Sequence, residues 1–314
     1  MLLVESDLSG RQVVGADSYI SWCESVFYSD AMSGSGQRGT FRAGDTVFCK
    51  IDEVLRFFEC LRLTRKRIVL VTGEGDLPCD EFRQRFLPAN VARWFAMNVT
   101  YAHPRVTAIP LGLGPRDDVV SANGAEIAGV RRAGIEREKW LYVNFRTESN
   151  PGLREPIYRH YHKLSLGGVE WITFQHPEPR GFQGRFADDL VSHRFVLCPP
   201  GNGVDTHRMW ETLAAGGIPI VARSGAMEPF RSLPILFVDD LCDVTLEFLE
   251  VEWARISGMP ANLAMLEADY WRSLIVSAAD GLRAENKMGW GEWVNEAVAY
   301  GFGMLKRRLS ESPH

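Results

Sequence analysis

The chain has 314 residues, of which 46% are hydrophobic and 24% are charged, and its formal net charge is −5. This length suits two domains of about 150 residues each, and the composition excludes disordered, collagen-like and coiled-coil proteins. A net negative chain also offers no strong positive field to a phosphate backbone, so we expect no basic nucleic-acid-binding patch.

The cysteines and the apolar runs indicate the compartment. None of the six cysteines forms a C-x-x-C pair, and several stand within apolar runs, where cysteine behaves as a small hydrophobic residue. No apolar run reaches the ~20 residues that span a bilayer, and the opening MLLVESDLSG lacks the features of an export signal. We therefore expect a cytoplasmic protein without integral membrane association.

The first half alternates apolar strands with helices, after about 40 weakly patterned residues. This alternation predicts a parallel sheet. The expected strands are Thr46–Cys49, Ile68–Val71 and Val106–Leu111, and the expected helices are Glu53–Leu63, capped by Asp52, and Pro88–Met97.

A glycine- and acid-rich loop, Thr72 to Asp76, directly follows the second of these strands. Ligands of open parallel sheets bind outside the carboxyl ends of strands, so Glu74 and Asp76 are candidate site residues. A plain turn with a capping aspartate is the alternative. His103 is a further candidate, although a loop histidine of this kind is more often structural or merely exposed.

A polar passage between Gly112 and Lys139 separates the two halves. We expect an N-terminal domain over residues 1–137, a C-terminal domain over 138–285 and a hinge near residue 138. Residues 286–314 form a C-terminal segment whose helical part, Trp290 to Leu309, could return to the first domain.

The second half repeats the alternation. The expected strands are Trp140–Phe145, Val169–Phe174, Phe195–Cys198, Ile218–Ala222 and Ile235–Val238, and the expected helices lie within Phe182–Val191 and over His207–Ala215. Arg146 and Arg154 follow the first of these strands. They are either candidate phosphate contacts or plain surface charges. The cluster Arg159 to His162 lacks the carboxylate or cysteine that would complete a zinc set, so we predict no metal site.

The central unit of this half is a strand, a Pro/Gly-rich loop from Pro199 to Gly203, and a helix that Asp205 or Thr206 caps. The amino end of such a helix attracts anions such as a diphosphate. Arg208 in the first turn is unfavourable there unless an anion is near. Glu211 shares its face, where it could bind a ribose diol or simply pair with Arg208 on a solvated surface.

Two common nucleotide folds lack support here. The loop has neither the Gly-Lys-Ser/Thr of a Walker loop nor the G-x-G-x-x-G fingerprint of a dinucleotide fold. A nicotinamide-dependent oxidoreductase is therefore disfavoured.

Several motifs together resemble the nucleotide-sugar-binding half of exostosin-like glycosyltransferases. The resemblance covers residues 142–230 and is carried by Phe195 to Pro200, Thr206-His-Arg208-x-x-Glu211, Ala214-x-Gly216-Gly-Ile-Pro219-Ile-Val221 and Glu228-Pro229-Phe230. It implies an α/β GT-B architecture, in which two Rossmann-like domains with parallel sheets face each other across a cleft. It also implies inverting transfer from a nucleotide-diphosphate sugar, first of all a UDP-sugar, to a glycan or other polymer, with no metal or other cofactor.

On this resemblance we expect the second domain to bind the donor and the first to supply the base. The expected donor residues are Arg146, Arg154, Pro200, Gly201, Asn202, Gly203, Thr206, His207, Arg208 and Glu211. For the base, Asp76 is the first choice, Glu74 the second and His103 the third. The alternative is a catalytically inactive GT-B-like module that binds a nucleotide sugar or a glycan.

Overall fold

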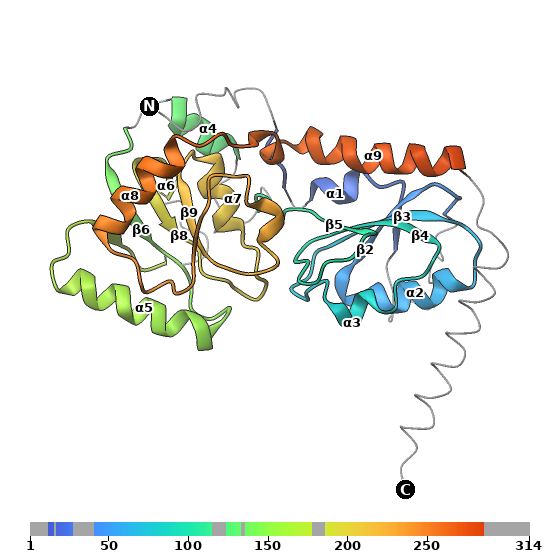
Figure 1. Cartoon of the computed structure of the whole chain (residues 1–314), viewed down its shortest axis with the longest axis horizontal. Coiled ribbons are helices and arrows are strands. Elements are labelled where there is room, and N and C mark those ends of the chain that lie inside the picture. The colour runs from blue at the N-terminus through green and yellow to red at the C-terminus, as the bar shows by residue number, and fades with distance from the viewer. Residues whose placement is uncertain are drawn as a thin grey trace, which may run out of the picture.

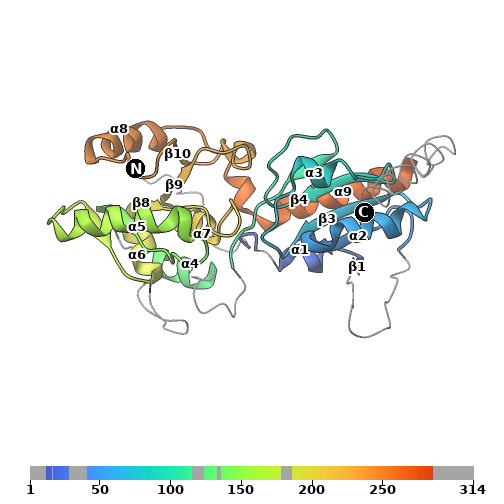
Figure 2. The same ribbon diagram turned by 90° about the horizontal axis from the view of Figure 1, so that it is seen from below.

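The computed structural model describes residues 12–15, 17–27, 41–114, 124–132, 136–177 and 186–285. They form two parallel sheets of five strands each, which lie side by side along the molecule (Figures 1 and 2). The predicted α/β class, with two Rossmann-like units on parallel sheets, is confirmed.

The first unit is built on a sheet in the order β1-β2-β3-β4-β5. Its strands are β1 (Ser25–Phe27), β2 (Thr46–Lys50), β3 (Ile68–Gly73), β4 (Val91–Ala96) and β5 (Val106–Ala108). Its helices are α1 (Ser18–Ser21), a 3-10 turn (Ile51–Glu53), α2 (Val54–Arg62) and α3 (Glu81–Gln84). Every residue of β3 is buried, which agrees with its uninterrupted apolar run.

Two local predictions for the first unit are wrong. The segment Pro88–Met97 contains the strand β4, not a helix. Its Val, Trp and Phe residues favour strands, and pairing with β3 and β5 on both sides outweighs the helical pattern. Asp52 does not cap α2, because it lies inside the preceding 3-10 turn and Glu53 takes the cap position.

The second unit is built on a sheet in the order β10-β9-β8-β6-β7. Its strands are β6 (Lys139–Val143), β7 (Ile172–Phe174), β8 (His193–Leu197), β9 (Ile218–Ala222) and β10 (Leu236–Val238). Its helices are α4 (Gly124–Arg132), α5 (Pro151–Leu166), α6 (Phe186–Ser192), α7 (His207–Ala214), α8 (Leu246–Ser257) and the 3-10 turns Glu228–Phe230 and Leu263–Leu266. The predicted helix within Phe182–Val191 is seen as α6, although residues 182–185 lie outside the described ranges.

Alternating residues of the second sheet point into two different cores. Leu141 and Phe195 pack with residues of α5 and α8. Tyr142 and Val196 belong to the cluster that holds the buried residues of α6 and α7. Helices therefore cover both faces, which leaves the carboxyl edge of the strands as the open side for a ligand.

The last described helix, α9 (Ala268–Glu285), lies against the first unit (Figure 1). It contacts β2, β3 and β4, and Arg283 forms an ion pair with Glu24. Residues 268–285 thus return to the first sheet, although the sequence-based division places them in the second domain. The helix expected between Trp290 and Leu309 lies outside the described residues, and the division into domains stays a prediction.

None of the helices within the described ranges combines the length and the apolar character that crossing a membrane requires.

Candidate functional site

The strand order of the second sheet reverses between β6 and β8. From β6 the chain adds β7 on one side, and then crosses to the other side to add β8, β9 and β10. In open parallel sheets, ligands bind in the crevice where the order reverses. The loops that follow β6 and β8 meet there, and they lead into the amino ends of α5 and α7.

Arg154 ties these two loops together. Its Nε donates to the carbonyl of Pro200 at 2.9 Å and its Nη2 to that of Pro199 at 2.8 Å. Its Nη1 donates to the carbonyl of Arg146 at 2.7 Å and to Ser149 Oγ at 2.6 Å. Four of the five guanidinium hydrogens are thus used within the protein, so Arg154 shapes the loop and has one hydrogen left for a ligand.

The backbone of Gly201 approaches this guanidinium closely. A Cβ atom on Gly201 would lie 3.0 Å from Arg154 Nη2. The Gly201 carbonyl also accepts a hydrogen bond from Asn150 Nδ2 at 3.0 Å. The predicted residues Arg146, Arg154, Pro200 and Gly201 are therefore brought together in one structure.

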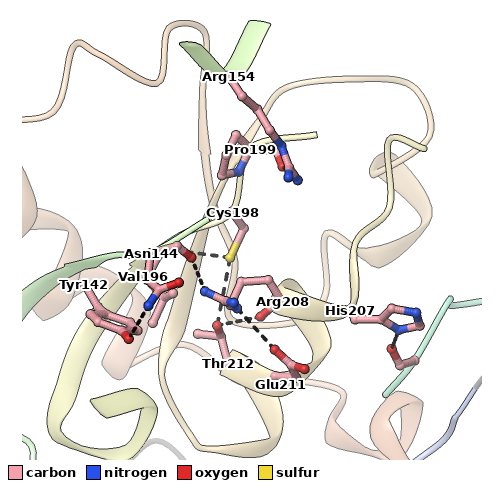
Figure 3. Close-up of polar contacts among 11 residues, drawn as sticks. Tyr142, Asn144, Arg154, Val196, Cys198, Pro199, His207, Arg208, Glu211 and Thr212 are labelled. Carbon is pink, nitrogen blue, oxygen red and sulfur yellow. Dashed lines mark hydrogen bonds and ion pairs between the residues drawn. The ribbon is translucent and has the colours of Figure 1, made fainter. Parts of the chain in front are cut away.

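Arg208 and Glu211 form a buried pair at the start of α7 (Figure 3). Arg208 Nε lies 3.2 Å from Glu211 Oε2, and Arg208 Nη1 donates to the carbonyl of Asn144 after β6. The guanidinium also stacks 4.2 Å above the ring of Phe186. The two side chains share a face as predicted, but Glu211 is only 2% exposed, so that face is not a solvated one.

Positive charge is concentrated at this point of the site. Burial, and after it the charge of Arg208, lowers the pKa of Arg154 to about 10. Holding two guanidinium groups near each other costs free energy that an anion between them would offset. Cys198, beside Arg208 in Figure 3, adds no negative charge because burial raises the pKa of its thiol to about 12.

The predicted residues Thr206 and His207 lie at the amino end of α7. Thr206 is the N-cap in an extended conformation, without a capping hydrogen bond from its side chain. His207 points away from Arg208 (Figure 3), and its Nδ1 donates to the carbonyl of Gly112 in the first unit at 2.8 Å. His207 is therefore a contact between the two units.

The acidic loop after β3 meets the loop after β8. Asn202 Nδ2 donates to Asp76 Oδ2 at 3.0 Å, across 126 residues of sequence. Glu74, in the same acidic loop, has a φ of 51° and forms an ion pair of 3.4 Å with Lys50. A Cβ atom on its neighbour Gly75 would lie 2.2 Å from Asp52 Oδ2 and 2.7 Å from Ile51 Cγ2, so a larger residue there would displace these side chains. Of the three predicted bases, Asp76 thus contacts the predicted donor loop, and Glu74 lies two residues before it in the acidic loop.

His103 is not brought to this place. It lies in the turn before β5, where its Nδ1 accepts a hydrogen bond from the backbone N–H of Arg105 at 3.1 Å. Burial and the charge of Arg105 both lower its pKa. Since β3 and β5 run parallel, a residue before β5 and one after β3 lie at opposite edges of the sheet.

Sequence reasoning missed Asn98 and assigned Asp205 only a capping role. Asp205 is buried, and its two carboxylate oxygens accept hydrogen bonds from the Leu111 backbone N–H at 2.7 Å and from Trp210 Nε1 at 2.8 Å. Burial raises its pKa to about 6. Asn98 has a φ of 51° and accepts from the backbone N–H of Asp205 at 2.9 Å. An Asp before a helix was a usable signal for Asp205, whereas Asn98 had none.

Among the residues that the structure describes, no three His, Cys, Asp or Glu side chains gather as metal ligands would.

Comparison with known proteins gives likeness of fold only. No protein-family model matches the chain, and no curated protein matches it either. The exostosin-like resemblance therefore rests on the motif residues alone.

Solved structures with related architecture include trehalose-phosphate synthases. The enzyme from Burkholderia multivorans is 13% identical, with 80% of this chain and 75% of that chain covered and a TM-score of 0.45. The one from Burkholderia vietnamiensis is 13% identical, with 82% and 74% covered and a TM-score of 0.38. The pneumococcal O-GlcNAc transferase GtfA, in complex with UDP and GlcNAc, is 12% identical, with 77% and 54% covered and a TM-score of 0.30. Likeness at this level carries no inference about activity, which has to come from the site itself.

Proposed function

We propose that this chain is a GT-B glycosyltransferase that takes its sugar from a nucleotide-diphosphate sugar. One observation carries the proposal. The anion-attracting loops of the second sheet, with Arg154 and Arg208, are joined to the acidic loop of the first sheet by the hydrogen bond between Asn202 and Asp76.

The second unit supplies what a departing diphosphate needs. Backbone N–H groups at the amino end of α7 and the guanidinium of Arg208 stabilise the negative charge that develops on the leaving group. Glu211 is almost fully buried behind Arg208, so we assign it the task of holding the guanidinium in place. This modifies the ribose contact that the sequence suggests for Glu211.

The first unit supplies the base. In an inverting transfer, an acceptor oxygen forms a bond to the anomeric carbon while the bond from that carbon to the diphosphate oxygen breaks. The acceptor proton passes to a carboxylate. Asp76, which contacts the donor loop through Asn202, is the first candidate for this carboxylate, and Glu74 in the same acidic loop is the second. No step in this scheme requires a metal.

Donor, acceptor and compartment complete the proposal. A UDP-sugar is the first donor to test, with a glycan or other polymer as the acceptor. The six cysteines are all free thiols, as a reducing cytoplasm would keep them.

The second candidate is a catalytically inactive module that binds a nucleotide sugar. It is favoured by the engagement of both carboxylates, since Asp76 accepts a hydrogen bond from Asn202 and Glu74 pairs with Lys50.

A thermal-shift panel of UDP-, GDP-, CMP- and TDP-sugars tests the donor site. A ligand at about 100 times its dissociation constant stabilises the native state by about 2.7 kcal/mol, so the right nucleotide raises Tm measurably. Release of free nucleotide from the stabilising sugar then separates an enzyme from an inactive module. If no member of the panel raises Tm or binds in calorimetry, both candidates are wrong.

A further inference from the structure

The loop after β8 is held by the first unit as well as by Arg154. Asn98, two residues after β4, is 6% exposed, and its Oδ1 accepts a hydrogen bond from the backbone N–H of Asp205 at 2.9 Å. Its carbonyl accepts from the backbone N–H of Cys79 at 2.9 Å. The side chain of Asn98 therefore reaches from a well-anchored backbone across to the second unit.

Asp205 makes the reverse connection. One carboxylate oxygen accepts from the N–H of Leu111, on the segment that leaves β5, and the other accepts from Trp210 inside α7. Asn98 and Asp205 together, which we call the clasp, thus join α7 and the loop before it to two separate segments of the first unit.

Gly203 shows how tightly the clasp shapes the loop. A Cβ atom at this position would lie 2.9 Å from Asn98 Nδ2 and 3.2 Å from Asn98 Oδ1. The carbonyl of Gly203 also accepts from the N–H of Gly201 at 3.0 Å, so a shift at Gly203 passes to the rest of the loop.

We propose that Asn98 and Asp205 are positioning residues, which set the distance between the anion site of the second sheet and the carboxylates of Glu74 and Asp76. The inference rests on the proposed function, because it concerns two groups of residues, on separate sheets, that take part in the same proposed reaction. Neither residue touches reacting atoms; both act through the loop that contains Asn202.

The variant Asn98→Gly tests this directly. Glycine adopts the positive φ of this position without strain, so the backbone is kept while the side-chain amide is lost. A displacement of about 1 Å between reacting groups can cost up to ~10²-fold in rate. We expect kcat for donor hydrolysis to fall by about 10- to 100-fold, while the Kd for UDP in calorimetry stays near wild type.

A double variant makes the test specific. Gly203→Ala alone places a methyl group against Asn98 and lowers kcat, whereas in the Asn98→Gly background the space is free. The pair should therefore have the kcat of Asn98→Gly alone. If the two losses simply multiply, the contact between these residues does not set the geometry.

The control is Ile157→Val, which loses one methyl group from the hydrophobic cluster under α5, a cluster to which no residue of the clasp belongs. It should lower Tm modestly and leave kcat and Kd unchanged below its melting range. If Asn98→Gly behaves like this control, the clasp has no positioning role.

A second measurement separates this inference from the proposed function. Spin labels on Cys60, which is exposed on α2, and on Arg159→Cys, exposed on α5, report the distance between the units, with Cys23 and Cys242 replaced by serine. If wild-type protein binds no nucleotide, the proposed function is wrong, and the labels alone decide on the clasp. A broader distance distribution in Asn98→Gly supports it, and an unchanged distribution overturns it.

Discussion

At the scale of single residues, the pair of Arg208 and Glu211 matters both for the stability of the fold and for the proposed binding of the donor. Each charge compensates the other in a site where neither reaches much solvent. Removing one partner of such a pair is strongly destabilising, because it leaves a buried charge alone. Single substitutions here therefore test stability and binding at the same time.

A double substitution separates the two effects. Arg208→Met with Glu211→Leu removes both charges and should leave the fold nearly as stable as wild type. Loss of the charged contact to the diphosphate should weaken UDP binding by roughly 1.5 to 3 kcal/mol, measured by calorimetry. The control Arg159→Ala breaks an exposed ion pair with Glu155, which should change neither property. Unchanged UDP affinity in the double variant would contradict the donor assignment.

Asp205 predicts a pH dependence of stability. Its pKa is raised from the ordinary 3.8 to about 6, so between these values the native state binds more protons than the unfolded state. Its contribution to the free energy of unfolding therefore falls as pH rises from about 4 to about 6, by about 3 kcal/mol. His193 opposes it, because burial lowers its pKa to about 4 and its contribution rises with pH over nearly the same window.

Urea unfolding from pH 4 to pH 6.5 measures this balance. Wild type should show a shallow profile, whereas Asp205→Asn should gain stability as pH rises, since the His193 contribution is then no longer offset by Asp205. The asparagine amide also faces two N–H donors, which lowers the free energy of unfolding at every pH. The test is therefore the slope of this free energy against pH, and not its absolute value. Parallel profiles for the two proteins would show that Asp205 does not titrate in this range.

Site residues that belong to a local motif could be predicted from the sequence. Residues that act on a segment distant in the sequence could not. The spacing of Thr206, Arg208 and Glu211 follows from helix periodicity, which is local. Asn98 carries no local signal, because its role depends on a backbone N–H that lies 107 positions away.

At the scale of elements, the strands of the second sheet were predictable because buried parallel strands are short apolar runs. β4 was missed for a physical reason. Arg93 interrupts its apolar run, and Pro88 suggests a helix start, although Val91, Trp94 and Phe95 fit a strand just as well. Only the pairing partners on both sides decide between the two structures.

Trp94 tests the structural importance of β4. It is fully buried, packs edge-on against Phe58 with ring centroids 5.4 Å apart, and donates from Nε1 to Thr72 Oγ1 at 2.8 Å. Trp94→Ala should lower the free energy of unfolding by about 3 to 5 kcal/mol, measured by urea unfolding. The neighbouring Arg93 is exposed, and Arg93→Ala should stay within about 0.5 kcal/mol of wild type. Equal effects of both variants would contradict the burial of this strand.

At the scale of the whole molecule, each unit depends on the other. The path of the chain joins them, and the proposed reaction needs residues from both. Helix α9 follows the second unit in sequence and packs on the first, while the clasp joins loops of the two units. The sequence suggests such a return for a later segment, Trp290 to Leu309, but not for α9, because the amphipathic pattern of α9 does not specify which sheet it covers. The two units are therefore expected to unfold together.

The last prediction concerns the identity of the catalytic base, which depends on a contact between the two units. Asp76 belongs to the first sheet, and its Oδ2 already accepts a hydrogen bond from Asn202 of the second. In Asp76→Asn, the amide oxygen can accept the same bond, so the loops keep their contact while the basic oxygen is lost.

Loss of a general base lowers kcat by about 10²- to 10⁴-fold, so Asp76→Asn should lower kcat by that order and leave UDP affinity near wild type. Steady-state rates and calorimetry on the same preparation provide the comparison. Asp280→Asn, on the exposed side of α9, is the matched control and should have wild-type kcat. If Asp76→Asn keeps its rate, the proton goes elsewhere, and Glu74→Gln should show the loss instead. Glu74 lies two residues before Asp76, where it pairs with Lys50 and has a backbone φ that few non-glycine residues adopt.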